Sequence, residues 1–206
     1  WNTRLIIVGT GENNSSRSSY AGVGILKSND NGKTWKNIGL NDSHHIGKIV
    51  INPNNPNEIV VAVLGHLYSK NKERGIFKTI DGGVTWENTL YIDESTGIID
   101  LDISPNNFKI QFASSWQKSR KAWDFKGNGE KSGIYKSVDS GNTWNLISAQ
   151  KSGFPTGNGV GRIGLAVFDS KTLYAVVDNQ FRRPKSKASI EKTDLSKNYF
   201  ESISKE

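Results

Sequence analysis

Residues 133–148 read GIYKSVDSGNTWNLIS, and this stretch decides the fold because close variants of it occur earlier in the chain. The variants are GILKSNDNGKTWKNIG at 24–39 and GIFKTIDGGVTWENTL at 75–90. All of them share the pattern [ST]-x-D-x-G-x-T-W. The aspartate of the pattern recurs roughly every 50 residues, a period typical of β-propeller blades rather than of helical solenoids.

Each copy of the pattern predicts a strand, a tight turn and a second strand. Before the aspartate, apolar and polar residues alternate, as in a half-buried strand. The aspartate can accept backbone N–H bonds, the glycine permits a positive φ, and the tryptophan supplies an apolar anchor for the returning strand. We therefore assign a structural role in these turns to Asp30, Gly32, Trp35, Asp81, Gly83, Trp86, Asp139, Gly141 and Trp144.

The rest of the period also repeats, because pairs of apolar strands joined by short polar turns occupy 46–65, 98–115 and 162–178. Each full unit thus has four antiparallel strands. We predict an all-β chain, one segment over 1–206, with blades at about 1–40 (lacking its inner strand), 46–91, 98–148 and 162–204, the last ending in a degraded hairpin at 189–204. Because a propeller closes to remove exposed strand edges, about four blades predict a sector of a larger propeller.

The repeated phrase resembles the Asp-box (BNR) repeat of sialidases, some endoglucanases and sortilin/VPS10 propellers. The wider sequence is similar to bacterial VPS10/sortilin-like, glycosyl hydrolase-like BNR-repeat proteins, on VGTGENN, HIGKIVINPNNP, RGIFKTIDGGVTW, SGIYKSVDSGNTW and GRIGLAV. This resemblance implies a parent propeller of about seven to ten blades. The repeat itself indicates little about the reaction or the ligand, because one fold hosts many functions.

The composition limits the classes of partner. The chain has 34% hydrophobic and 23% charged residues, a net charge of +7 and no Cys, so disulfides and thiolate metal sites are excluded. It has no apolar run long enough to span a bilayer. The positive charge favours anionic partners, but no nucleic-acid motif accompanies it, so we expect no nucleic acid. We predict an extracytoplasmic location, and a chain that opens on a strand and lacks Met is expected to be a piece of a longer protein.

No cofactor or metal is predicted. The GTG at 9–11 precedes no helix and lacks a third glycine, so it does not form a dinucleotide site. His44, His45 and His66 invite a metal interpretation, but the His-His doublet lacks a third ligand at a diagnostic spacing. We expect these histidines to be solvated or to support other groups.

The long connections of a four-stranded blade lie on the face opposite the Asp-box turns, and here they occupy 10–22, 65–74, 114–132 and 178–188. They are rich in aromatic and basic residues. Aromatic faces stack on sugars or peptides, and cations attract carboxylates or phosphates. We predict that the ligand contacts are Tyr20, Tyr68, Arg74, Trp116, Arg120, Trp123, Arg182 and Arg183. For Trp116 and Trp123 the alternative is that they pin the long loop onto its neighbour.

A second group of residues comes from the innermost strands. Aligned on the turn that follows, Lys48, Asp100 and Arg162 occupy equivalent positions in successive blades. We expect an inter-blade salt-bridge ring near the channel mouth, with Asp100 kept ionised by its cationic neighbours. Asp102 projects to the same side of its strand as Asp100.

Catalysis is the less favoured hypothesis. Glycoside hydrolysis needs two opposed carboxyl groups, and the spacing fixes no such pair among Glu12, Asp93, Glu94, Asp100 and Asp124. The weak catalytic candidates are Asp100, Glu12 and Arg162. The leading hypothesis is a non-catalytic binding propeller that presents its aromatic, basic loop face to a peptide, a protein or an acidic glycan. The alternatives are a sialidase- or endoglucanase-like hydrolase completed by further blades, and a structural docking module.

Overall fold

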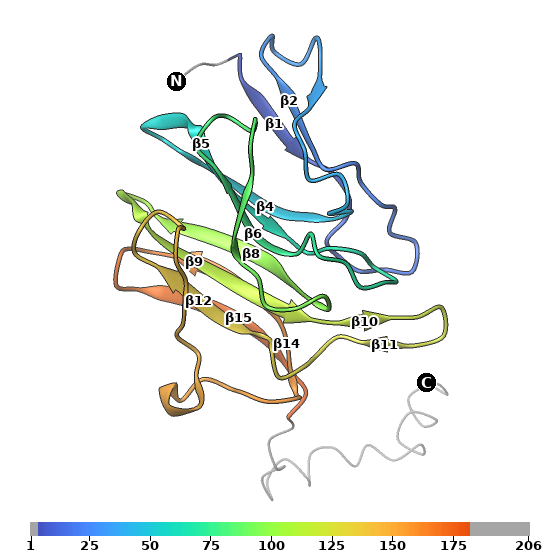
Figure 1. The fold of residues 1–206 in the computed structure, drawn as a ribbon. Coiled ribbons are helices and arrows are strands. Elements are labelled where there is room, and N and C mark those ends of the chain that lie inside the picture. Colours follow the sequence, from blue (N-terminus) through green and yellow to red (C-terminus); the bar gives the residue numbers. More distant parts are fainter. Residues whose placement is uncertain (1–3, 182–206) are drawn as a thin grey trace, which may run out of the picture.

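The computed structural model describes residues 4–181 as antiparallel sheets that fan side by side, a sector of a β-propeller (Figure 1). The all-β propeller prediction is therefore confirmed. In this range the helical element is a single 3-10 turn, Gln150–Ser152, and no helix could cross a membrane. The hairpin predicted at 189–204 lies outside the described residues.

The first three sheets follow the order of the chain. The first is three-stranded, as predicted, and contains β1 (Ile6–Gly9), β2 (Ile25–Ser28) and β3 (Lys36–Asn37). The second contains β4 (Ile46–Asn52), β5 (Asn55–Val63), β6 (Gly75–Thr79) and β7 (Glu87–Leu90). The third contains β8 (Thr96–Ser104), β9 (Asn107–Gln117), β12 (Gly133–Ser137) and β13 (Asn145–Leu146).

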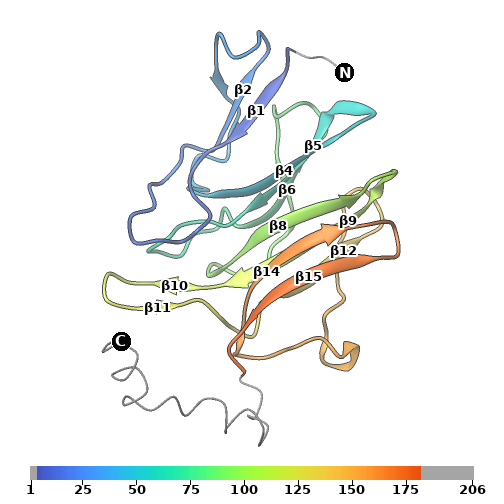
Figure 2. The same ribbon diagram turned by 180° about the vertical axis from the view of Figure 1, so that it is seen from behind.

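Two further strand pairs complete the described chain. The fourth sheet shows its two inner strands, β14 (Val160–Val167) and β15 (Leu173–Asn179). The connection from β9 to β12 forms a small hairpin of its own, β10 (Ser119–Arg120) and β11 (Phe125–Lys126), which projects from the body in Figures 1 and 2. The sequence pattern did not predict this hairpin. Strands β4, β8 and β14 contact one another, so the first strand of each four-stranded unit is innermost.

The core lies between the sheets. Alternation along β5 sends Val61 and Val63 toward the first sheet and Val60 and Ala62 toward the third, and all four are fully buried. A strand covered on both faces needs a continuous apolar run, which is why this strand does not alternate in polarity. Burial of both faces of β5 thus holds three blades in one stack.

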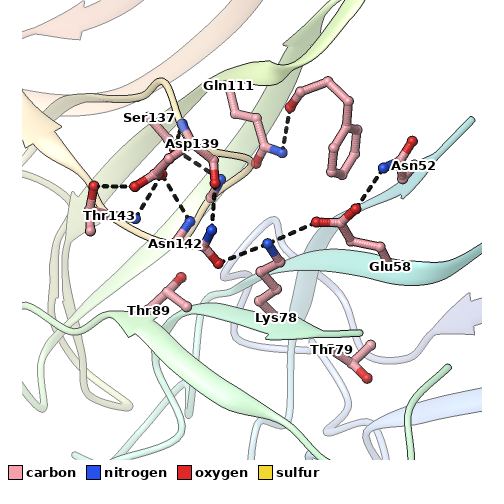
Figure 3. Close-up of polar contacts among 12 residues, drawn as sticks. Asn52, Glu58, Lys78, Thr79, Thr89, Gln111, Ser137, Asp139, Asn142 and Thr143 are labelled. Carbon is pink, nitrogen blue, oxygen red and sulfur yellow. Dashed lines mark hydrogen bonds and ion pairs between the residues drawn. The ribbon is translucent and has the colours of Figure 1, made fainter. Parts of the chain in front are cut away.

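The turn between β12 and β13 shows how the repeated pattern builds its corner (Figure 3). The Asp139 carboxylate accepts hydrogen bonds from Ser137 Oγ at 2.7 Å, Thr143 N at 2.9 Å and Thr143 Oγ1 at 2.6 Å. Gly141 has φ +80° and donates its N–H to Ser137 Oγ at 2.9 Å. The same contacts recur in the other two turns, so these carboxylates stabilise the turns.

These turns are expected to weaken in acid. Burial acts in the opposite direction, but hydrogen bonds from Thr143 and Ser137 hold the pKa of Asp139 at about 2; Thr34 and Ser28 do the same for Asp30. An unfolded aspartate titrates near about 4. Because the folded pKa is depressed, this stability is present above pH of about 4 and is lost as the pH falls toward about 2. Urea midpoints measured across this pH range should fall less in Asp139→Asn than in the wild type. As a control, Asp124→Asn in the β10–β11 hairpin should behave as the wild type. An unchanged acid response in Asp139→Asn would contradict this role.

The repeats also bind neighbouring blades together. Trp86 Nε1 donates to Ile38 O at 2.7 Å, and Trp144 Nε1 reaches Thr89 Oγ1 at 3.3 Å, each in the preceding blade. Trp35 instead bonds to Gly32 in its own turn and is 45% exposed.

A lysine in the first strand of two Asp-box hairpins reaches in the other direction, to the next Asp-box turn. Lys27 Nζ donates to Gly82 O at 2.9 Å. Lys78 Nζ donates to Asn142 Oδ1 at 2.9 Å (Figure 3). Lys78 also pairs with Glu58 Oε1 at 2.8 Å. Each of these turns therefore receives a lysine from the blade before it.

Candidate functional site

Three long connections meet at one end of the sector, opposite the Asp-box turns (Figure 1). Tyr68 Oη donates to Arg17 O at 2.8 Å, which joins the second blade to the first. Arg120 Nη2 donates to Ser15 O at 2.6 Å, which joins the third blade to the first. The predicted gathering of long loops on one face is therefore observed for three of the four loops, and most of the fourth, 178–188, lies outside the described residues.

A cavity of about 180 Å³ lies where these loops meet. Its lining includes four cationic side chains and no carboxylate: Lys70, Arg74, Lys118 and Arg120, together with Tyr68 and three serines. Clustered cations surrounded by protein raise the local positive potential. The cavity is thus suited to an anionic group.

Arg74, a predicted ligand contact, lines the cavity, and its guanidinium is already bonded to backbone carbonyl groups. It is only 2% exposed, and its guanidinium donates to Leu64 O at 2.7 Å, His66 O at 2.8 Å and Ser69 O at 2.9 Å. Burial lowers its pKa to about 10, so it stays charged at neutral pH. Arg74 holds the 65–74 loop and adds its charge to the cavity.

Trp116 was also predicted to contact a ligand, and its contacts are those expected of the alternative, a residue that anchors the long loop. It is 4% exposed, its Nε1 donates to Gly127 O at 2.7 Å, and its ring meets Phe125 edge-on at 6.1 Å between centroids. Trp116 therefore pins the long loop of the third blade. In contrast, Trp123 is 83% exposed and Tyr20 is 86% exposed.

Lys118 also lines the cavity, although it is not among the ligand contacts predicted from the sequence. Its pKa is lowered to about 7, first by burial and then by Arg74 and Arg120, and its Nζ donates to His66 O at 3.3 Å. Nothing in a loop with several lysines marks this one as buried. A lysine that titrates near neutral pH can respond to a bound anion, because a nearby negative charge favours its protonated form.

Arg120 and Tyr68, two other predicted ligand contacts, both border the cavity. Arg120 stacks 3.9 Å from the centroid of Phe125 while it donates to Ser15, so its guanidinium forms a fixed wall of the cavity. Tyr68 is 53% exposed and borders the same cavity. Arg182 and Arg183 lie outside the described residues.

The predicted ring of inner-strand charges is only half present. Lys48 Nζ lies 3.4 Å from Asp100 Oδ1, but Asp100 Oδ2 accepts the N–H of Leu165 at 2.9 Å, and Arg162 lies over the Trp116 ring at 5.8 Å. Asp102 likewise accepts the N–H of Val167. The two aspartates thus fasten the third blade to β14.

Arg162 lies in an irregular part of β14. Val160 pairs with Asn179 and Ile163 with Val177, so Gly161 and Arg162 oppose the single residue Asp178. Lys48 and Asp100 instead have regular partners directly after the bulges of their strands. A bulge redirects side chains locally, which accounts for the different direction of Arg162.

The weak catalytic candidates are not brought together. Glu12 accepts a hydrogen bond from Asn14 Nδ2 at 3.1 Å, and its own N–H donates to His45 Nδ1. No hydrogen bond or ion pair within 4–181 joins Glu12, Asp100 and Arg162 to one another.

Residues 24–205 match the family model Sortilin-Vps10, described as sortilin, neurotensin receptor 3. The chain belongs to the Sortilin-Vps10 family. No curated protein sequence matches this Sortilin-Vps10 chain significantly. The family assignment agrees with the resemblance stated from the repeats.

Solved structures similar to this Sortilin-Vps10 chain include propeller enzymes of the GH74 class. The GH74 xyloglucanase of Xanthomonas campestris aligns with a TM-score of 0.56 and 14% identity, over 88% of this chain and 26% of that one. The GH74 enzyme of Niastella koreensis gives 0.55 and 19%, over 86% and 26%. An ancestral GH74 enzyme gives 0.53 and 19%, over 82% and 21%. The chain spans about a quarter of these enzymes, and at such identities the likeness supports the fold alone.

Proposed function

We propose that this chain is part of a non-catalytic binding propeller whose loop face takes an acidic ligand, namely a carboxylate-bearing peptide, protein or glycan. One observation carries this proposal: the cavity between the long loops is lined by four cations without a carboxylate. Tyr68 lines the cavity, and the exposed rings of Tyr20 and Trp123 on the other long loops offer further stacking surfaces.

The burial of these cations favours an anionic ligand. Lys118 and Arg74 are 5% and 2% exposed, and each lies in the positive field of the other. Burying like charges together is costly, and a bound carboxylate offsets that cost by pairing with them. Arg120 and Lys70 lie at the more open side of the same cavity.

Binding of an acidic ligand should depend on the charge of Lys118. Because its pKa is about 7, affinity should fall as the pH rises from about 6 to about 8. Across this range Arg74 stays charged and His45, with a pKa of about 4, stays neutral. Lys118→Gln should weaken binding about tenfold or more and remove this pH dependence, since a charge-assisted hydrogen bond contributes about 1.5–3 kcal/mol. Titration calorimetry of the full-length protein with oligoglutamate and oligogalacturonate measures both effects.

Two further variants make the test specific. Lys118→Arg should keep the affinity at high pH, because arginine does not deprotonate in this range. Lys171→Gln, in the β14–β15 turn at the opposite end of the sector, should bind as the wild type. Equal affinities for Lys118→Gln and Lys171→Gln would contradict the proposed site.

A glycoside hydrolase completed by other blades is the second candidate, favoured by the fold likeness to GH74 enzymes. Asp100 is held by the Leu165 N–H of β14 and by Lys48, which suits a structural carboxylate better than a general acid. Incubating the full-length protein with xyloglucan and chromogenic glycosides decides between the two. Turnover that Asp100→Asn abolishes would replace the binding proposal.

We also propose that further blades and an extracytoplasmic location belong to the parent protein. The first blade exposes Ile6, Val8 and Trp35 by 37–45%, whereas Trp86 and Trp144, the equivalents of Trp35, pack against a preceding blade. A blade of the same kind would cover this face. Family membership supports a secreted, periplasmic or cell-surface location.

A further inference from the structure

Three metal-ligating side chains converge beside the loop face, from connections that are far apart in sequence. Asp42 and His44 precede β4, and His66 follows β5. One ligand atom from each lies within 4.8 Å of the others, and the two imidazoles stack with centroids 3.5 Å apart. His66 Nε2 lies 3.0 Å from Asp42 Oδ1.

We propose that Asp42, His44 and His66 bind a divalent first-row transition metal ion, with Zn²⁺ as the reference ion. Two imidazoles and a carboxylate are ligands that Zn²⁺ accepts, and three protein ligands leave a position for water or a ligand group. The two imidazoles stack at 16° between their planes, so ion binding requires the rings to rotate until both lone pairs point at the ion. His44 and His66 are partly exposed, so an ion can enter from solvent.

The hydrogen bonds around His66 prepare its Nε2 for a cation. Its Nδ1 lies 2.7 Å from Ser69 Oγ. When Nδ1–H donates to that hydroxyl, Nε2 presents a lone pair toward the carboxylate of Asp42, and two acceptors then face each other. A metal ion between them satisfies both, and a hydrogen-bonded second ring nitrogen is the usual support of a metal-bound histidine.

The Asp42 carboxylate faces the two histidines and attracts a cation. Arg74 opposes a metal ion from one side, but its guanidinium is bonded to three carbonyl groups.

His45 does not take part, although it is adjacent to His44. It is 2% exposed and its Nδ1 accepts the N–H of Glu12 at 3.0 Å. The two rings of the doublet are perpendicular, at 86°. Only one member of the doublet therefore faces His66, and the third ligand comes from a loop that no local spacing reveals.

The test is titration of the full-length protein with Zn²⁺ by calorimetry, with Co²⁺ absorption spectroscopy as a report on the ligands. We expect one saturable site, lost or weakened more than about tenfold in His44→Gly, His66→Gln and Asp42→Asn. His44 has φ +54°, so glycine fits its backbone and this variant should fold. Ser69→Ala should weaken the site about tenfold to a hundredfold by releasing the His66 ring.

The Zn²⁺ titration has a control variant and two results that would contradict the proposal. Asp124→Asn should bind Zn²⁺ as the wild type, and affinity should fall in acid, because metal binding requires deprotonated ligands. Absence of a saturable site in the folded wild-type protein would overturn the proposal. So would unchanged Zn²⁺ affinity and Co²⁺ spectra in folded His44→Gly. Both readouts are independent of whether the cationic cavity binds an acidic ligand.

Discussion

Lys78→Ala should lower the free energy of unfolding by about 3 kcal/mol, one of the two largest effects that we expect. Lys78 is 5% exposed, and its Nζ bridges Glu58 Oε1 at 2.8 Å and Asn142 Oδ1 at 2.9 Å (Figure 3). Removal of the lysine leaves Glu58, whose side chain is 15% exposed, with only Asn52 Nδ2 as its hydrogen-bond donor. The loss also separates the second blade from the Asp-box turn of the third.

Urea unfolding measures this loss, and the chain offers a matched control. Lys27 occupies the equivalent position in the first blade but donates only to Gly82 O, so Lys27→Ala should cost about 1 kcal/mol. The double variant Lys78→Met/Glu58→Leu should recover most of the stability, because a buried ion pair can be replaced by apolar groups. A loss in Lys78→Ala no larger than that in Lys27→Ala would contradict the bridging role.

Trp116→Ala should lower the free energy of unfolding by about 3–5 kcal/mol, while Trp123→Ala should change it by less than about 0.5 kcal/mol. Trp116 packs on Leu64 and Ile99, donates to Gly127 O and supports Arg162, so its loss leaves a cavity under the long loop. Trp123 is 83% exposed at the tip of the β10–β11 hairpin. The two tryptophans thus have opposite expected effects on stability.

Ligand binding by the Trp116 and Trp123 variants tests the second difference between the two residues. Trp123→Ala should reduce affinity for an acidic peptide or glycan with no change in unfolding, because its ring is exposed to solvent beside Lys121 and can stack on a ligand. Thermal unfolding and calorimetry of the same two variants give both quantities. Equal destabilisation of the protein by the two substitutions would show that the assignment of Trp116 as a loop anchor is wrong.

The sequence predicted the fold well because its signals are local and repeated. The aspartate, glycine and threonine of each turn are close in sequence, so their hydrogen bonds follow from the pattern. The paired apolar runs at 46–65 and 98–115 likewise predicted the innermost strands and their partners. The missing inner strand of the first blade was visible for the same reason.

The candidate site was harder to predict because its geometry depends on which loop residues turn inward. Arg74, Trp116 and Lys118 have the composition of a binding surface, yet all three are buried. A bulge in β14 places Arg162 outside the expected ring, and sequence alignment alone does not reveal a bulge. His66 reaches His44 only through the packing of two blades.

The most direct test of the central claim is amide hydrogen exchange of the full-length protein with and without saturating oligoglutamate or oligogalacturonate. If the loop face binds the ligand, exchange should slow in 65–74 and 117–126, which carry the cationic cavity and the adjoining hairpin, and should stay unchanged in the Asp-box turns. Slowing confined to the Asp-box turns, or no slowing at saturation, would contradict the claim.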